Sequence, residues 1–214
     1  MTTAIIGVGN LGGTVARHLV SGGESVVLAA KDESRAQSVA NELGPNASAA
    51  SVEEAIAGAD VVVLATWLDQ TRELVPARTR LLKDKVVVDP SNPIGFDENG
   101  QMFRTLPQGE AAGSIVAGLL PESAHYVKAF GTLGADQLAT SANREPRVVL
   151  FYATDDDAAE ATAQRLIRAA GFEPLKVGGV SDAGRIEGPD GELQGRIFDL
   201  GGARATIATK GVKA

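Results

Sequence analysis

Residues 3–12 read TAIIGVGNLG, and this stretch decides the fold. An apolar run, the predicted strand Thr3–Gly7, passes directly into glycines with the G-x-G-x-x-G spacing, and a predicted amphipathic helix follows. Gly7 permits a tight turn, Gly9 lets the backbone approach a pyrophosphate, and Gly12 lets the helix pack close to the strand. The helix N-terminus presents unpaired N–H groups to phosphates. The stretch therefore predicts a dinucleotide-binding unit made of a strand, a turn and a helix.

Beyond this unit, short β-branched runs alternate with amphipathic stretches, which is typical of a parallel sheet with helices on both faces. The runs are rich in valine without polar alternation, as expected for strands buried on both faces. We predict an α/β protein with a Rossmann-type, doubly wound and mainly parallel sheet. Its strands are expected at Thr3–Gly7, Ser25–Ala30, Ala47–Ala50, Asp60–Thr66, Lys85–Asp89, His125–Phe130, Arg147–Thr154 and Pro174–Val177.

Helices are predicted after several of these strands. The run of three aspartates at 155–157 is interpreted as the acidic N-terminus of a helix and not as a metal site, because acids are favoured there without any metal. The inward residues of this helix are predicted to be Ala158, Ala161, Leu166 and Ile167. Further helices are expected from residue 11 to a stop at 22–23, over 51–59 behind a capping box, over 69–82, and from about 193 to 207.

We expect one NAD(P)-binding domain over residues 1–214, with residues 178–214 as a C-terminal extension of the same domain. The segment from Gly178 onward is glycine-rich and polar, unlike the rest of the chain. By analogy we expect a homodimer, because the last helix is surplus to the predicted core.

Composition narrows the classes of partner. Hydrophobic residues make up 44% and charged residues 22% of the chain, and the net charge is −7, so a nucleic-acid partner is not expected. The absence of cysteine excludes thiol catalysis and thiolate metal sites, and His18 and His125 are too few for a histidine-rich metal centre. No signal peptide and no run long enough to cross a bilayer are visible. We therefore expect a soluble cytoplasmic protein with no membrane partner and no metal.

The second predicted strand closes on Ala29 and Ala30, where NAD-binding proteins place an acid that binds the ribose 2′-hydroxyl. Without that acid a 2′-phosphate is not repelled, and the residues next along the chain include cationic and hydroxyl groups that can bind it. Two acids, Asp32 and Glu33, stand in the same loop. The pattern favours NADP(H), and the donors are expected to be Lys31, Ser34 and Arg35.

Several stretches together resemble the NADPH-dependent reductases of the deazaflavin coenzyme F-420 and their bacterial relatives. They are IIGVGNLGGTVARHL, VVLATW at 62–67, KVVVDPSNP at 85–93, YVKAFGTLGADQL at 126–138, and residues 152–187, which include ATDDD and GFEPLKVG. The resemblance covers nearly the whole chain. It implies a small-molecule redox partner: NADPH would pass hydride to coenzyme F-420 or a similar flat acceptor such as a flavin.

The resemblance also implies where the ligands lie. The pyrophosphate would lie on Gly7, Gly9, Asn10, Leu11 and Gly12, with the 2′-phosphate on Lys31 and Arg35. The ribose and nicotinamide would be lined by Ala65, Thr66 and Trp67. The second ring would lie in a crevice at the strand ends, formed by Pro90, Asn92, Pro93, Thr132, Leu133, Gly134 and Ala135.

Transfer of hydride to a flat ring requires stacking of two rings and no dedicated side-chain acid, so no catalytic residue is assigned. Ketone reduction would instead need a positioned proton donor. Tyr126 and Lys128 share one face of a predicted strand, but they lack the Tyr-x-x-x-Lys spacing and are interpreted as ordinary strand positions. His125 is interpreted as a surface residue, and Trp67 as either a packing residue or a cofactor contact.

Two alternative functions remain open. One is an NADPH:flavin or ferric reductase that uses the same crevice with a different second ring. The other is a non-catalytic NADPH-binding module that senses the redox ratio. The β-hydroxyacid dehydrogenases and imine reductases share the first half of the architecture, but they need a further helical domain for which this chain is too short.

Overall fold

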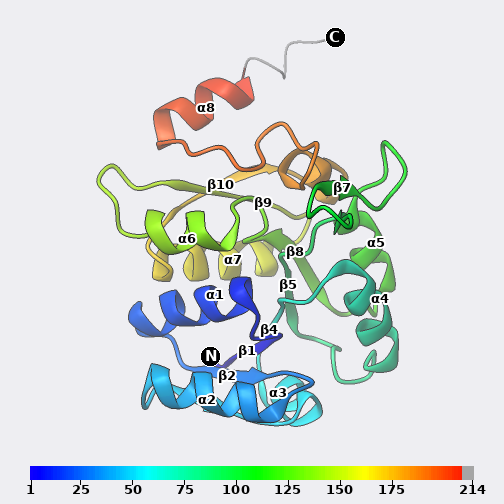
Figure 1. The fold of residues 1–214 in the computed structure, drawn as a ribbon, viewed down its shortest axis with the longest axis vertical. Coiled ribbons are helices and arrows are strands. Elements are labelled where there is room, and N and C mark those ends of the chain that lie inside the picture. The colour runs from blue at the N-terminus through cyan, green and yellow to red at the C-terminus, as the bar shows by residue number, and fades with distance from the viewer. Residues whose placement is uncertain (209–214) are drawn as a thin grey trace.

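A computed structural model describes residues 1–208 and shows an open sheet between two layers of helices (Figure 1). The sheet has eight strands in the order β10-β9-β8-β5-β4-β1-β2-β3. All eight predicted strands are present, most of them one or two residues shorter than expected. Their bounds are β1 Thr3–Ile6, β2 Val26–Ala29, β3 Ala47–Ala49, β4 Val61–Leu64, β5 Val86–Asp89, β8 His125–Ala129, β9 Val149–Ala153 and β10 Glu173–Gly178.

The sheet is mainly parallel, which confirms the predicted Rossmann-type fold. From β3 to β8 every neighbouring pair runs parallel, so the carboxyl ends of these strands meet at one edge. β9 runs antiparallel to β8, and β10 runs parallel to β9. The order β3-β2-β1-β4-β5-β8 is the dinucleotide-binding order. Successive strands are added to one side of β1 and then to the other, and this change leaves a crevice beside β1.

Helices cover both faces of the sheet. One face packs against α1 Asn10–Ser21, α2 Glu33–Leu43, α6 Ala135–Ser141 and α7 Asp157–Ala169. The other face packs against α3 Val52–Gly58, α4 Leu68–Ala77 and α5 Ala112–Leu119. Within β4, Val61 and Val63 face the first layer while Val62 and Leu64 face the second, which is why the strand is apolar throughout.

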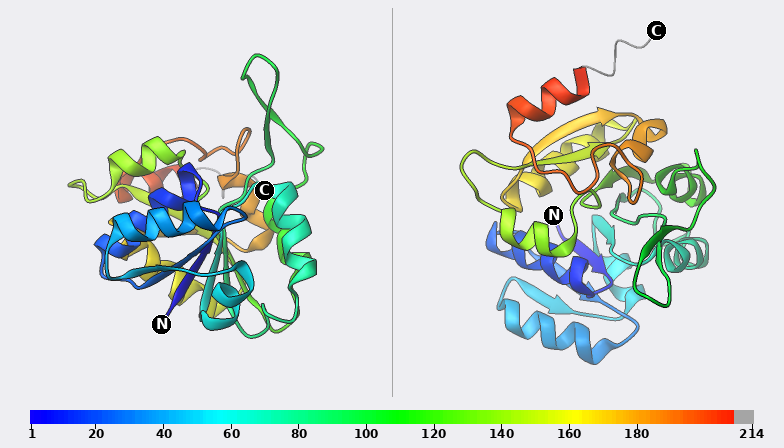
Figure 2. Two further views of the ribbon diagram at one scale, coloured as in Figure 1. Left: turned by 60° about the horizontal axis from the view of Figure 1, so that its bottom comes forward. Right: turned by 45° about the horizontal axis from the view of Figure 1, so that its top comes forward.

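Three further elements lie outside these layers. A hairpin of β6 Ile94–Phe96 and β7 Met102–Arg104 stands away from the body of the molecule (Figure 2, left). The 3-10 helix η1 Val180–Ile186 and the helix α8 Leu200–Ala208 pack with β9 and β10 around a smaller apolar cluster. The predicted C-terminal extension thus has structure as far as residue 208, and its last residues, 209–214, lie outside the described residues.

The first helix, the capping box and the acidic helix start were predicted correctly. α1 buries Val15, Ala16 and Leu19 and ends before Gly22. Ser51 and Glu54 form the reciprocal capping box of α3. Asp156 caps α7 by accepting a 2.8 Å hydrogen bond from the N–H of Ala159.

Three helix predictions were wrong in detail. α4 ends at Ala77 and not at 82, because Pro76 interrupts the hydrogen-bond ladder and the hydroxyl of Thr79 donates to the last carbonyls. The last helix begins at Leu200 and not near 193, because Gly195 adopts a left-handed φ of 70°. In α7 the residues predicted to face inward, Ala158 and Ala161, are exposed, and Ala159, Thr162 and Ala163 take their place beside Leu166 and Ile167.

The hairpin and the helices α2, α5 and α6 were not predicted. The hairpin strands are short and largely exposed, and α5 and α6 are short and rich in alanine, glycine and polar residues, so neither shows a clear period. Within the described part of the chain, no helix is long and apolar enough to cross a membrane.

Candidate functional site

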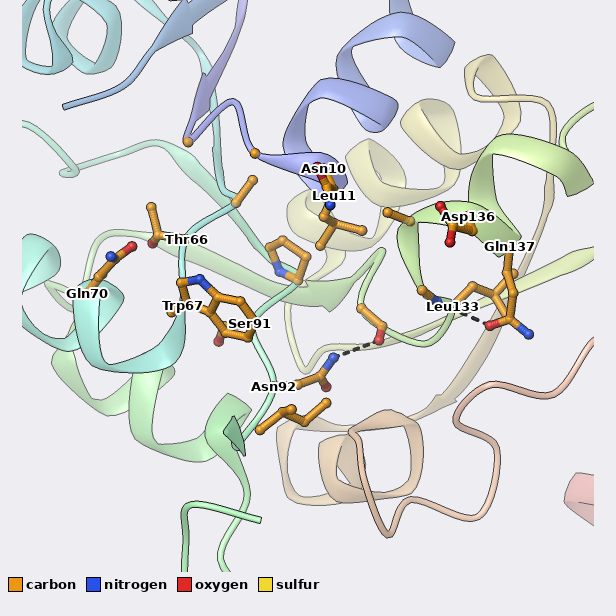
Figure 3. Close-up of a pocket in the computed structure, with 18 of the residues that line it drawn as sticks. Asn10, Leu11, Thr66, Trp67, Gln70, Ser91, Asn92, Leu133, Asp136 and Gln137 are labelled. Atoms are coloured by element: carbon orange, nitrogen blue, oxygen red, sulfur yellow. Dashed lines mark hydrogen bonds between the residues drawn. The ribbon is translucent and has the colours of Figure 1, made fainter. Parts of the chain in front are cut away.

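A pocket of about 870 Å³ opens at the carboxyl ends of the parallel strands (Figure 3). One side, which we call the glycine wall, consists of Gly7, Gly9, Asn10, Leu11, Arg35, Ala65, Thr66, Trp67 and Gln70. The opposite side, which we call the far wall, consists of Pro90, Ser91, Asn92, Ile94, Phe96, Met102, Gly131, Leu133, Gly134, Ala135, Asp136, Gln137 and Gln194. The volume lies in the upper part of the range for ligand sites.

The glycine turn has the geometry that a pyrophosphate requires. Gly7 has a left-handed φ of 100°, and its N–H donates to the carbonyl of Ala29 at 2.8 Å. A Cβ at Gly12 would lie 1.9 Å from the oxygen of Gly7, so the close packing of helix on strand excludes any side chain there. A Cβ at Gly9 would meet nothing within 4 Å, because this residue faces the open pocket at the N-terminus of α1. The turn therefore fits a dinucleotide phosphate beside the free N–H groups of α1.

Beyond β2, Asp32 is held by hydrogen bonds at the start of α2. Asp32 is the N-cap of α2 and accepts hydrogen bonds from the backbone of Ser34 and Arg35. The hydroxyl of Ser34 also donates to Asp32 at 2.7 Å, and this bond, followed by that from the N–H of Arg35, holds the pKa of Asp32 below its ordinary value. Since the Ser34 hydroxyl is already engaged, Lys31 and Arg35 are the exposed donors left for a 2′-phosphate, and only Arg35 lines the pocket.

The segment after β4 forms the middle of the glycine wall. The carbonyl of Ala65 lies against Gly7, and the hydroxyls of Thr66 and Thr71 are hydrogen bonded at 2.8 Å. Trp67 is 56% exposed at the mouth of the pocket and meets Phe96 of the hairpin edge to face, with ring centroids 6.1 Å apart. Trp67 is therefore not a core residue, and its ring spans the gap between the two walls.

The loop after β5 is held rigidly at the base of the far wall. Asp89 accepts a 2.8 Å hydrogen bond from the N–H of Ser91. The side-chain amide of Asn92 donates to the carbonyl of Gly131 at 2.8 Å and accepts from the N–H of Gly188 at 3.1 Å. Figure 3 shows Asn92 reaching across to the 131 loop by this bond. The loop is thus tied both to the segment after β8 and to the C-terminal part of the chain.

Beneath this loop lies a buried charged cluster. The ammonium of Lys128, 1% exposed, contacts the carboxylates of Asp89 at 3.1 Å and Glu187 at 3.3 Å and donates to the carbonyl of Ser91. Tyr126 donates to Asp89 at 2.8 Å, and burial, followed by the charge of Asp89, raises the pKa of Tyr126 well above its usual range.

Tyr126 and Lys128 do share one face, but they are not ordinary strand positions as interpreted from the sequence. They bind the only two carboxylates that this buried region contains among the described residues. Neither residue lines the pocket, so neither can donate a proton to a ligand there.

The segment after β8 completes the far wall. Leu133 is buried against the core while lining the pocket, and Gly134 and Ala135 begin α6. Thr132 is 2% exposed and lies behind the pocket surface, where its carbonyl accepts a 2.7 Å hydrogen bond from the N–H of Gly195. The side chain of Gln137 donates to the carbonyl of Gly195 at 2.9 Å.

The two histidines and Arg185 lie outside the pocket. His125 stands at the amino end of β8 and pairs with Asp156 at 2.7 Å, on the edge of the sheet opposite the pocket. His18 contacts the carbonyl of Leu138 at 3.1 Å and packs edge to face on Phe172. Arg185 pairs with Glu192 at 2.8 Å within the C-terminal segment.

The structure brings most of the predicted site residues into one pocket. Five others adjoin it without forming its surface: Gly12, Lys31, Ser34, Pro93 and Thr132. Nine lining residues were not predicted: Gln70, Ser91, Ile94, Phe96, Met102, Gly131, Asp136, Gln137 and Gln194. Ser91 and Gly131 stand next to predicted residues and could have been found by extending the motifs. No local pattern points to the hairpin residues or to Gln194, which reach the pocket only through the tertiary fold.

Comparison with known proteins agrees with this geometry. Residues 2–93 match the family described as NADP oxidoreductase coenzyme F420-dependent. The F420-dependent NADP reductase of Methanothermobacter thermautotrophicus is 25% identical over 197 residues, which cover 87% of this chain and 85% of that protein. The metalloreductase STEAP3 of Rattus norvegicus is 28% identical over 183 residues, 86% of this chain, but the match spans only 35% of that longer protein.

Solved structures are also similar. A hypothetical protein from Sinorhizobium meliloti superimposes with a TM-score of 0.82 and 28% identity, covering 93% of this chain and 95% of that chain. A putative F420 dependent NADP-reductase from Arthrobacter sp. FB24 shares the fold, with a TM-score of 0.73 and 23% identity over 85% of this chain and 86% of that one. The chain is thus similar over residues 2–93 to the family of NADP oxidoreductases described as coenzyme F420-dependent, and the reductase of Methanothermobacter thermautotrophicus extends that similarity over most of its length.

Proposed function

We propose that this oxidoreductase transfers hydride between NADPH and a flat ring acceptor, the deazaflavin coenzyme F-420. The observation that carries the proposal is the composition of the pocket. One continuous cavity joins the glycine wall to a far wall with apolar surfaces from Ile94, Phe96 and Leu133, and Trp67 stands where the walls meet. Two flat rings stacked in such a cavity need positioning more than acid–base catalysis.

The ionisable residues support ring reduction over carbonyl reduction. Reduction of a ketone requires a proton donor beside the reacting oxygen. Within the described residues, the only ionisable side chains lining the pocket are Arg35 and the exposed Asp136, and no tyrosine, lysine or histidine reaches it. Tyr126 and Lys128, the pair that could have served, are held in the buried cluster.

In this proposal each wall has a separate task. The glycine turn and the N-terminus of α1 hold the pyrophosphate, and Lys31 and Arg35 hold the 2′-phosphate. NADPH supplies a hydride from C4 of its nicotinamide. Residues 65–67 orient the nicotinamide side of the pocket, while the loop at 90–93 and the segment 133–135 hold the second ring at stacking distance.

The test is an absorbance assay with purified protein, oxidised coenzyme F-420 and either NADPH or NADH. We expect the deazaflavin band to bleach with NADPH and much less with NADH. No bleaching, in a sample whose NADPH binding is shown by fluorescence, would reject coenzyme F-420 as the acceptor. It would leave two candidates: a flavin or ferric reductase, and a redox sensor that binds NADPH without transfer.

A second candidate is an NADPH:flavin or ferric reductase. It is favoured by the similarity to the rat metalloreductase, which extends over 86% of this chain. The same assay with FMN, and with FMN plus a ferric chelate, separates the two candidates. Faster oxidation of NADPH with FMN than with coenzyme F-420 would favour the flavin.

A further inference from the structure

The part of the chain after η1 forms one side of the pocket instead of a separate appendage. Gln194 lines the pocket although it lies about one hundred residues from the Asn92 loop beside it. The ribbon between η1 and α8 runs back across the body before α8 begins (Figure 2, right). We call residues 187–195 the closing segment.

The closing segment is anchored to both loops of the far wall. At its start, Glu187 is completely buried and accepts 2.7 Å hydrogen bonds from the N–H groups of Ala112 and Gly113, besides contacting Lys128. Next along the segment, the N–H of Gly188 donates to Asn92. At the end, Gly195 is bonded to the 132–137 segment through both its N–H and its carbonyl.

Between these anchors, Gln194 brings a free amide to the pocket. Its backbone N–H donates to the carbonyl of Gly191 at 3.1 Å, but its side-chain amide has no hydrogen-bond partner among the described residues. The amide lies against the far wall: a Cβ at Gly188 would be 3.1 Å from Nε2 of Gln194 and 2.6 Å from Cδ1 of Ile94. The neighbouring glutamine, Gln137, differs because its amide is already bonded to Gly195 and Gly134.

A glutamine amide presents one donor and one acceptor side by side. Its complement is a cyclic amide, in which a ring carbonyl stands next to a ring N–H. Flavins and deazaflavins carry this group on their pyrimidinedione ring, so the two acceptors considered above share it. The nicotinamide carboxamide is also an amide, but the glycine wall places the dinucleotide on the opposite side of the pocket.

We propose that Gln194 is a specificity-determining residue that binds the cyclic-amide edge of the acceptor ring, and that the closing segment exists to position it. This inference rests on the proposed function, because it takes a second ring in the far half of the pocket as its ligand. It extends that function by naming the group on the acceptor that is recognised and the residue that recognises it.

The test measures binding of two ring probes, oxidised coenzyme F-420 and FMN, by their own fluorescence in the presence of saturating NADP⁺, so that no turnover occurs. Gln194→Leu keeps the size of the side chain and removes both hydrogen-bonding groups. Losing them should weaken the binding of both probes by roughly ten-fold while the affinity for NADPH stays unchanged. Gln194→Glu, which can only accept hydrogen bonds, should weaken binding further. Gln108→Leu, the same change at an exposed position outside the pocket, is the matched control.

Three results would overturn the inference: equal affinity of Gln194→Leu and the unaltered protein for both probes, an equal loss of NADPH affinity, or no binding of either ring by the unaltered protein. Failure of the proposed function is seen separately, as absence of NADPH-dependent turnover in the unaltered protein. Turnover together with an unchanged dissociation constant in Gln194→Leu would reject the role of Gln194 alone.

Discussion

The glycine wall and the far wall of the pocket are built in different ways. The glycine wall comes mainly from two short segments that directly follow β1 and β4, and its turn presents backbone groups to the pocket. The far wall is assembled from the Asn92 loop, the hairpin, the segment after β8 and Gln194, and it presents side chains. The shape of the glycine wall therefore depends on local backbone conformation, whereas the shape of the far wall depends on the contacts that hold distant segments together.

The buried cluster under the far wall is what holds those segments together. Lys128 lies between the carboxylate that fixes the Asn92 loop and the carboxylate that anchors the closing segment. Glu187 is further stabilised by the first N–H groups of α5. Among the described residues, the glycine wall has no equivalent of this cluster. Four predictions test the contrast, from the largest expected effect to the smallest.

The largest effect is expected for Lys128→Met, which removes the one cation from the cluster. It leaves Asp89 and Glu187 buried without their shared partner, and breaking a buried pair in this way costs about 3–5 kcal/mol of the free energy of unfolding. Chemical denaturation of both proteins measures the difference. Lys176→Met is the matched control: its partner Glu160 lies in a half-exposed pair, and such pairs are worth about 0–1 kcal/mol. If both variants lost a similar free energy of unfolding, the buried cluster would not explain the difference between the far wall and the glycine wall.

A double variant keeps this prediction informative if the single variant does not fold. Lys128→Met with Glu187→Gln removes one carboxylate charge together with the cation and keeps one of the two oxygens that accept from the N–H groups of Ala112 and Gly113. It should be more stable than Lys128→Met alone. A double variant that is less stable than either single variant would mean that the charges do not interact as the geometry indicates.

The next effect separates two positions within the glycine wall. In Gly12→Ala the new methyl group meets the backbone of Gly7 at 1.9 Å, so the helix must shift, and overpacking of this kind costs about 1–3 kcal/mol. The Cβ of Gly9→Val meets nothing within 4 Å, so the free energy of unfolding should hardly change while the branched side chain occupies the proposed phosphate site. Thermal unfolding and NADPH titration measured on both variants test this. Unchanged NADPH affinity in Gly9→Val would show that the pyrophosphate does not lie on this turn.

The same contrast explains what the sequence could predict. The strands and the glycine turn follow from short-range patterns, since valine runs mark buried strands and glycine marks positions that need a left-handed φ or a close approach. The glycines of the turn, Gly7 and Gly9, were therefore reachable from a local motif, whereas residues 65–67 were expected only from the family resemblance. Gln194 was reachable from neither, because the polar stretch around it shows no period and its place depends on Glu187 meeting α5 and Lys128. The single-residue phase error in α7 has a related cause: in a helix made mostly of alanine, two neighbouring faces look alike.

A smaller and more selective effect is expected at the rim of the glycine wall. Lys31→Asp replaces an exposed cation by an acid beside the proposed site of the 2′-phosphate. NADPH affinity should fall by about ten-fold, the loss expected for one charge-assisted hydrogen bond, while NADH affinity changes little. Lys83→Asp, the same charge change at an exposed position away from the pocket, is the control. An equal loss for both dinucleotides would mean that Lys31 acts through the general field of the protein and not on the phosphate.

The smallest effect concerns the ionisation of the two tyrosines, of which Tyr126 reports on water beneath the far wall without any change to the protein near neutral pH. Burial, with a further contribution from Glu160, outweighs the lowering effect of the Gln164 hydrogen bond and raises the pKa of Tyr152 from 10.0 to about 12. Burial also raises the pKa of Tyr126 well above 10.0. Since both folded values lie above the unfolded value, the stabilisation is complete below pH 10.0 and is lost as the pH rises through the folded pKa.

The near-ultraviolet absorbance of tyrosinate should therefore stay absent in the folded protein as the pH passes 10.0, and the first phenolate should form near pH 12, from Tyr152. Tyr152→Phe isolates Tyr126, whose hydroxyl donates to Asp89 inside the cluster. In that variant tyrosinate should appear only together with the loss of the circular dichroism signal of the folded state. A phenolate that forms near pH 10.0 in this variant while it is still folded would mean that water reaches Tyr126 and Asp89. The cluster beneath the far wall would then be hydrated, and it could not account for the difference between the two walls.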